Sequence, residues 1–270
     1  MAQSLRTKKA FTLVELLVVI GIIALLISIL LPALSKARKS AQDVKCMANM
    51  KQIMMATMMY ANDNRQFLPY TGWGDTLASA TGRQWPTIGV VNWAYDGSAT
   101  KAANTFKVDH LKTGVLWPYC GGKVELFRCP SDAGPWIANQ YTQMTSYCAN
   151  GCMGGWAGRT GSETANKKIG RFKPYAAMYF EIFATAGGGE GNDASDTPNQ
   201  PVSVRHNGKS TVIGYIDGHV GFLNKDVYQD WINKAGGDGS ENPLWCLPQP
   251  EGNSDGGWGN TVNNMVFQET

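Results

Sequence analysis

A segment late in the chain that holds two of its three histidines could carry acid–base or metal chemistry. Ten residues separate His206 from Asp217, and Gly218 and His219 follow directly. Imidazole beside carboxylate suits proton transfer or metal binding. Hairpin residues whose polar side chains satisfy nearby backbone groups are the commoner explanation of such a pattern. The chain has no His-Glu-x-x-His sequence and no phosphate-binding loop, and we expect that it is not an enzyme.

A Gly-rich stretch gathers side chains that could hold a cation. The oxygen-bearing residues are Glu190, Asn192, Asp193 and Asp196. Oxygen ligands on a flexible loop suit calcium, although the twelve-residue EF-hand spacing is absent. Solvated turn residues are the simpler explanation of the same cluster. Calcium at this loop is therefore a better ion candidate than a metal at His206, and no other cofactor is expected.

These groups belong to a chain of 270 residues whose N-terminal region has the sequence of a membrane segment. Residues 16–35 carry no charge, and a helix of this length reaches roughly 30 Å, the thickness of the bilayer core. A secretory signal peptide has a shorter apolar region and a small-residue cleavage site. A short basic leader precedes the segment, and such a leader is easily kept in the cytoplasm, so we place residues 36–270 outside.

Two residues do not fit a plain membrane anchor. Glu15 lies at the border of the apolar run, where a carboxylate is costly unless something pairs with it. A position among the lipid headgroups is the alternative. Pro32 lies inside the helical pattern, where it removes a backbone hydrogen bond and bends or melts the helix. The alternative for Pro32 is a helix end at the membrane exit.

The sequence KKAFTLVELLVVI at residues 8–20 resembles the prepilin N-terminal cleavage and methylation motif, which type IV pilins and type II secretion pseudopilins share. The resemblance implies that a membrane peptidase cuts between Ala10 and Phe11 and methylates the new amine. The family usually has glycine where this chain has Ala10. The resemblance also implies that Glu15 neutralises the N-terminal amine of a neighbouring subunit. Gly21 and Pro32 resemble positions where pilin helices loosen on leaving the bilayer.

A long helix is predicted from Phe11 to Asn62. Residues 33–62 contain neither proline nor glycine, and apolar residues recur at spacings of three and four. A methionine stripe extends this apolar face and is expected in the core. Its members are Met47, Met50, Met54 and Met58.

The remaining residues, 65–270, are rich in glycine and hold all nine tryptophans. Strand-like runs occur at 123–128, 144–149, 175–184, 211–216 and 219–223, and residues 226–235 suggest a short helix. Asp217-Gly218 is a hairpin signal because both residues tolerate positive φ. We expect an α+β fold in which a long N-terminal membrane-spanning helix packs on an antiparallel sheet of four or five strands in a loop-rich head.

Four segments are therefore expected. Residues 1–10 are a leader that is removed, 11–35 the transmembrane and assembly half of the helix, 36–64 its amphipathic half, and 65–270 a globular β-rich head. The leader holds the charge excess of 24 basic over 21 acidic residues, since it carries three basic residues and no acid. No basic patch then remains, and no nucleic-acid partner is expected.

Three short sequences in the head resemble the large pseudopilin-like proteins abundant in planctomycetes and their relatives. They are LFRCPSD at 126–132, SYCAN at 146–150, and RHNG at 205–208 followed by DGHV at 217–220. The hallmark of those proteins is a histidine, nine residues and Asp-Gly, so this chain has one residue more. The resemblance implies a disulfide between Cys46 and Cys129 that ties the helix to the sheet.

The six cysteines lack the paired close spacing of a zinc ribbon. Outside the cytoplasm disulfides can form, and we favour them over a metal site. Cys148 with Cys152 is a second candidate pair, and Cys120 with Cys246 is a third.

We expect a structural subunit of a pilus or pseudopilus, and type II protein secretion is the role we favour for it. The resemblance implies that the chain waits in the inner (cytoplasmic) membrane, in contact with lipid, is processed by the prepilin peptidase and is extracted by an inner-membrane assembly platform. Copies of the chain then stack through their helices into a periplasmic or cell-surface filament. The alternative is a minor type IV pilin or surface adhesin that binds glycan through its aromatic residues.

Overall fold

A computed structural model of the chain describes residues 12–71, 93–95, 108–132, 145–150, 153, 168–182, 195–196 and 202–233. The chain forms two compact units, Met1–Gln42 and Asp43–Thr270, which are described separately. The boundary between them falls inside the long helix α1 (Leu13–Asp63). The helix therefore contributes its first half to one unit and its second half to the other.

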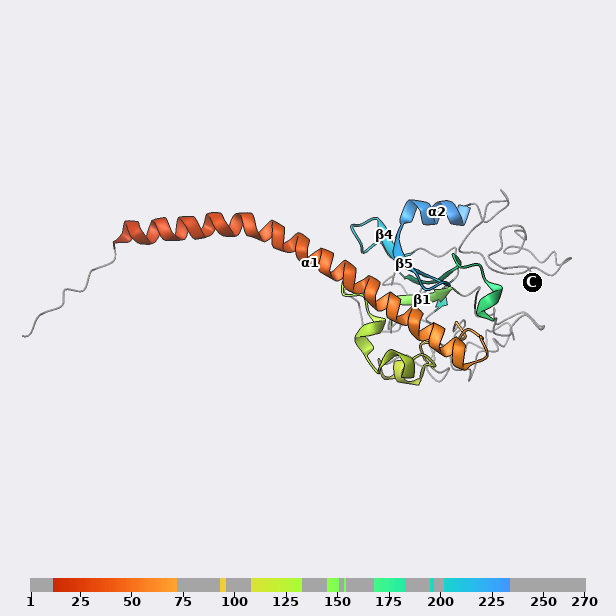
Figure 1. Ribbon diagram of the computed structural model, residues 1–270. Coiled ribbons are helices and arrows are strands. Elements are labelled where there is room, and N and C mark those ends of the chain that lie inside the picture. The colour runs from red at the N-terminus through yellow and green to blue at the C-terminus, as the bar shows by residue number, and fades with distance from the viewer. Residues whose placement is uncertain are drawn as a thin grey trace, which may run out of the picture. The chain divides into compact units, whose positions relative to one another are not determined.

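The first half of α1 presents its apolar side chains outward. Every residue from Leu13 to Leu34 is exposed, and the helix contains an 18-residue window with a mean hydropathy of 3.1, none of it buried. Its length and composition allow it to cross a membrane. Pro32 has no N–H to offer the carbonyl of Ser28, yet the helix runs through this position without interruption (Figure 1). The alternative of a helix end at Pro32 is therefore wrong, and loosening of the helix on leaving the bilayer stays a prediction.

The second unit is built on one five-stranded sheet with the order β3-β1-β2-β4-β5. The strands are β1 (Tyr147–Asn150), β2 (Ala177–Glu181), β3 (Ser195–Asp196), β4 (Ser210–Tyr215) and β5 (Val220–Asn224). Strands β1, β2, β4 and β5 are antiparallel to their neighbours, whereas β3 runs parallel to β1. The short helix α2 (Lys225–Asn233) follows β5. This arrangement confirms the α+β fold.

The second half of α1 packs on this sheet through the methionine stripe. Met50 and Met54 are fully buried, and Met47 and Met58 pack against the same core. Gly214 of β4 lies so close to the helix that a Cβ atom there would approach Met54 Cγ to 2.9 Å. The hydroxyls of Thr57 and Tyr179, 3.0 Å apart, hydrogen-bond helix to sheet. The absence of a side chain at residue 214 therefore permits the close packing of α1.

Short 3-10 helices complete the core beside the sheet. They are η2 (Val108–Thr113), η3 (Pro118–Cys120), η4 (Val124–Phe127) and η6 (Ile169–Arg171). The strand expected at 123–128 is wrong, because this segment forms η4. The side-chain amide of Asn49 donates to the carbonyls of Glu125 and Arg128 at 3.1 and 2.8 Å. These carbonyls are thereby bound to the helix rather than to a neighbouring strand.

Candidate functional site

A reciprocal pair of hydrogen bonds caps the start of α1. The backbone N–H and the hydroxyl of Thr12 both donate to Glu15 Oε2 at 2.8 Å, and the Glu15 N–H donates to Thr12 Oγ1 at 3.3 Å. This is a capping box, which satisfies helix-start donors and places a carboxylate at the positive end of the helix dipole. Glu15 is thus held beside the residue that follows Phe11 in the sequence. Ala10 and Phe11 themselves lie outside the described residues.

Gly21 and Pro32 lie on the exposed half of α1. A Cβ atom built on Gly21 would meet nothing within 4 Å. Glycine at this position therefore does not serve packing within the first unit of a single chain. Its expected role in assembly stays a prediction.

The second unit contains a buried group of polar and sulfur-bearing side chains, which we call the His206 cluster: Asp43, Cys46, Cys129, Glu181 and His206. Asp43 and Cys46 come from α1, Cys129 follows η4, Glu181 ends β2, and His206 precedes β4. Cys46, Cys129, Glu181 and His206 are at most 1% exposed. Segments that are far apart in sequence therefore meet at one point between helix and sheet.

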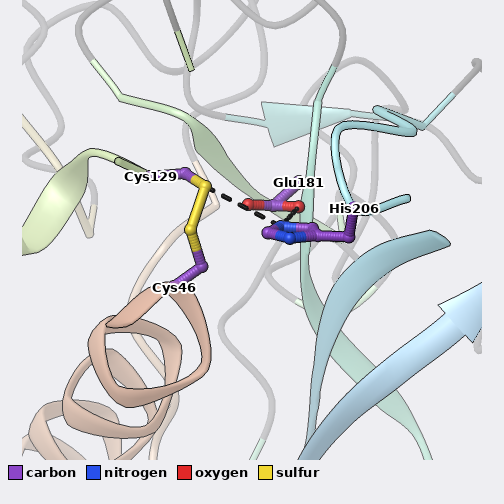
Figure 2. Close-up of side chains that lie close together, drawn as sticks. All are labelled: Cys46, Cys129, Glu181 and His206. Carbon is purple, nitrogen blue, oxygen red and sulfur yellow. Dashed lines mark hydrogen bonds and ion pairs between the residues drawn. A yellow bond between two sulfur atoms is a disulfide. The ribbon is translucent and has the colours of Figure 1, made fainter. Parts of the chain in front are cut away.

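The imidazole of His206 lies at the centre of this cluster. Its Nδ1 is 2.6 Å from Asp43 Oδ1, and its Nε2 is 2.9 Å from Glu181 Oε2. Cys129 Sγ is 3.7 Å from the same Nε2, and this sulfur forms a disulfide with Cys46. Figure 2 shows the ring and the Glu181 carboxylate beside the sulfur of Cys129. The disulfide is the pairing that the family resemblance implies.

Two opposing effects set the pKa of His206. Burial by itself lowers it, because a buried cation loses its hydration. Hydrogen bonding and charge attraction from Glu181, and then from Asp43, outweigh burial and raise the pKa above its ordinary value. The cluster therefore favours the imidazolium form, which pairs with two carboxylates.

A second polar layer holds the segments of the His206 cluster in place. Arg205 pairs with Asp132 at 3.0 Å and donates to the Ile182 carbonyl at 2.8 Å. The Ser146 hydroxyl donates a hydrogen bond to Asp132 at 2.8 Å, and its oxygen accepts a hydrogen bond from the Cys129 N–H at 2.8 Å. The segments that resemble the planctomycete-type proteins therefore converge here, because Cys129, Asp132, Ser146 and Arg205 belong to them.

The structure does not bring His206 together with Asp217 and His219, and it agrees with the commoner explanation that these are hairpin residues. Asp217 accepts hydrogen bonds from the backbone N–H and the ring of His219, and both side chains are exposed. His206 precedes β4 and Asp217 follows it, and six strand residues span about 20 Å. Gly218 lies in the hairpin turn and has a φ of 84°. Its carbonyl accepts a hydrogen bond from Lys51 Nζ at 2.7 Å. Asp217 and Gly218 therefore make the turn, as the hairpin signal predicts.

The remaining cysteine predictions have different outcomes. Cys120 is a buried free thiol, and burial raises its pKa to about 12. Its candidate partner Cys246 lies outside the described residues. Cys148 Sγ contacts the Phe180 carbonyl at 3.7 Å, and its expected partner Cys152 lies outside the described residues.

The calcium prediction falls almost entirely outside the described residues. Glu190, Asn192 and Asp193 are not described, and of Asp196 only the backbone is, as part of β3. Calcium binding there stays a prediction. A melting temperature that changes neither with calcium nor with a chelator would contradict it.

Sequence reasoning missed Asp43 and Glu181 as members of the site. The sequence does mark Glu181 as unusual, because it is a single acid inside the apolar run 175–184. Asp43 lies three residues before Cys46, so both face the same side of a helix. The sequence does not show that these two carboxylates converge on one imidazole.

The raised pKa of His206 predicts a pH-dependent stability of the second unit. Among the residues that the structure describes, the charged groups that face the ring are Asp43 and Glu181, with the Arg205–Asp132 pair adjacent. A group with a raised folded-state pKa contributes stability that is fully present below the unfolded pKa, about 6.5, and is lost as pH rises through the folded pKa. We expect urea unfolding to give a higher free energy of unfolding at pH 6 than at pH 9. Replacing His206 with glutamine should flatten this dependence; an unchanged pH profile in the variant would contradict the assignment.

The capped apolar helix, the α+β unit and the N-terminal motif together define a type IV pilin-like protein of the prepilin cleavage and methylation class. Residues 5–31 match a family model described as the prokaryotic N-terminal methylation motif. Residues 35–180, more than half of the chain, match the family described as protein of unknown function DUF1559, and the chain belongs to this family.

One curated relative extends the likeness to pilins. The chain is 43% identical over 63 residues to the type IV wide pilus major component PilA4 of Thermus thermophilus. The alignment covers 23% of this chain and 48% of that protein, so it spans about half of the relative's length. No solved structure matches the chain.

Proposed function

We propose that the chain is a structural filament subunit that residues 11–35 hold in the cytoplasmic membrane until assembly. The observation that carries this proposal is the exposed apolar half of α1, which begins with a capped carboxylate and is not covered by any described residue of its own unit. In a membrane, lipid covers these side chains; in a filament, the helices of neighbouring copies replace the lipid. Glu15 then neutralises the N-terminal amine that cleavage creates on a neighbouring copy.

Within this class we propose that the type II protein secretion machinery assembles the chain into its filament. The head would lie outside the cytoplasm, where the Cys46–Cys129 disulfide is stable, and growth of the fibre would push cargo outward. An inner-membrane platform would supply the extraction step. A surface pilus is the second candidate, and the likeness to a wide-pilus component favours it.

Glycan binding is a weaker candidate. Among the described residues, Trp93 is fully buried between aromatic neighbours, and Trp117 and Trp231 are partly buried against the two cores. Their packing role needs no ligand.

An anchored enzyme is also a weaker candidate. Residues 252–256 read Gly-Asn-Ser-Asp-Gly, which fits the Gly-x-Ser-x-Gly pattern. A nucleophile elbow needs a strand before the serine and a helix after it, and the flanking sequence is rich in Pro, Gly and Asn instead. We therefore propose no catalytic role.

The experiment that tests the filament proposal is expression of the full chain together with a prepilin peptidase and an assembly platform. Shearing the cells and imaging both the sheared material and the periplasm should reveal filaments that contain the chain. Filaments confined to the periplasm would support the secretion assignment, and long surface filaments would support the pilus assignment. Correctly processed chain that stays entirely as single copies in the membrane, beside a control pilin that assembles, would contradict both.

A further inference from the structure

The His206 cluster has the ligand set of a metal site hidden behind a disulfide. One ligand atom from each of Cys46, Cys129, Glu181 and His206 lies within 4.8 Å of the other three. In a tetrahedral zinc site, metal–ligand bonds of about 2.0–2.3 Å place the ligand atoms roughly 3.3–3.8 Å apart. Small side-chain rotations therefore suffice to bring the four atoms to a zinc ion once the two sulfurs separate. Two thiolates, one imidazole and one carboxylate are all ligands that zinc accepts.

The surroundings of His206 support this interpretation independently of the distances. Metal-bound histidines commonly donate their second ring N–H to a carboxylate, which fixes the ring and the tautomer. Asp43 lies 2.6 Å from Nδ1, in the position of that carboxylate, so that Nε2 faces Glu181 and Cys129. With Nδ1 bound to Asp43, the second ring nitrogen lies on the sulfur side of the cluster, where it also pairs with Glu181.

Glu181 supplies a second independent observation. Its Oε2 accepts the Val212 N–H at 3.2 Å and pairs with His206, but its Oε1 is buried and has no hydrogen-bond partner. A buried carboxylate oxygen without a partner is costly, because it has lost its hydration and gained nothing in return. A cation bound beside Cys129 and His206 would give the carboxylate a ligand role and remove this cost.

We propose that the second unit binds one zinc ion through Cys46, Cys129, His206 and Glu181 when the disulfide is reduced. A dithiol reductant supplies two electrons and two protons: the Cys46–Cys129 bond breaks, two thiols form, and the reductant becomes a disulfide. Zinc then displaces both thiol protons and any proton on Nε2, all of which leave to water. Disulfide and zinc are thus alternative links between α1 and the segment after η4.

Alternative ions fit the same cluster less well. Calcium and magnesium prefer oxygen ligands and larger coordination numbers, so two thiolates exclude them. Copper(I) accepts thiolates but gains little from the carboxylate. The mixed sulfur, nitrogen and oxygen set therefore commits the proposal to zinc, with cobalt(II) as its spectroscopic substitute.

The test uses the purified full chain in detergent, with cobalt(II) as the probe. The chain is measured oxidised and after reduction with a phosphine that is then removed under anaerobic conditions. We expect the reduced chain to take up one cobalt ion with the visible bands of tetrahedral coordination and a thiolate charge-transfer band, and one equivalent of zinc to bleach both. The oxidised chain should show at least about 10-fold less signal.

Variants separate this site from the other thiols. Replacing Cys46 and Cys129 together with alanine should remove the signal, whereas the matched Cys120→Ala control, which deletes a buried thiol outside the cluster, should keep it. Asp43→Asn leaves all four ligands and should weaken metal binding by about 10–100-fold. Far-UV circular dichroism checks that each chain is folded.

Three results would overturn the proposal. The first is a folded, reduced chain without charge-transfer absorption. The second is absorption that the double cysteine variant retains. The third is a reduced chain that unfolds although an equivalent of cobalt or zinc is present.

Discussion

Replacing Cys46 and Cys129 together with alanine should lower the free energy of unfolding of the second unit by about 4–5 kcal/mol. The disulfide closes a loop with a sequence separation of 83 residues, and removing a cross-link of this span returns that much chain entropy to the unfolded state. For a unit of this size the loss corresponds to a fall in melting temperature of about 10 °C or more. Thermal unfolding followed by circular dichroism in the presence of a chelator measures it.

The matched control for this prediction is Cys120→Ala. It truncates a buried cysteine of the same core without opening a cross-link. We expect a loss of about 1 kcal/mol from the missing sulfur contacts. A double variant that is no less stable than this control would show that the disulfide contributes little to the unit.

Replacing Glu15 with alanine should abolish filament assembly while the chain stays in the membrane. In the filament proposed here, the variant would leave the amine of a neighbouring copy unpaired in apolar surroundings. Removing one member of a buried ion pair costs about 3 kcal/mol or more, equivalent to over roughly 100-fold in association. The amount of the chain in sheared filaments, relative to the amount in membranes, measures the effect.

Thr12→Ala is the control that separates assembly from helix capping. It removes the two hydrogen bonds that the Thr12 hydroxyl makes with Glu15, and it keeps both the backbone N–H of residue 12 and the carboxylate. The helix start should lose about 0.5–2 kcal/mol, and assembly should continue. If Glu15→Ala assembled as readily as the parent, or if Thr12→Ala failed to the same extent, the charge-pairing role of Glu15 would be wrong.

The sequence was sufficient for the features that depend on local patterns. The charge-free run predicted the exposed half of α1, and the methionine spacing predicted the buried half. Asp217-Gly218 predicted the turn between β4 and β5 because few residue pairs tolerate the required backbone. The Cys46–Cys129 pairing came from a family resemblance, since spacing alone leaves the connectivity open.

Features that depend on distant contacts could not be read in the same way. Residues 123–128 look like a strand, but the Asn49 side chain binds the carbonyls that a strand would offer to its neighbour. Glu181 looks like an ordinary strand residue until the fold buries it beside His206. The wrong strand at 123–128 and the missed role of Glu181 have the same cause, which is a contact with a residue far away in the sequence.

The central claim is that the mature chain begins at Phe11 and assembles through the helix that follows it. Intact-mass measurement with N-terminal sequencing, on chain recovered from membranes that contain a prepilin peptidase, tests this claim most directly. We predict a chain that starts at an N-methylated Phe11 and lacks residues 1–10. A chain that keeps Met1 and the basic leader in those membranes, while a control prepilin is cleaved, would contradict the account.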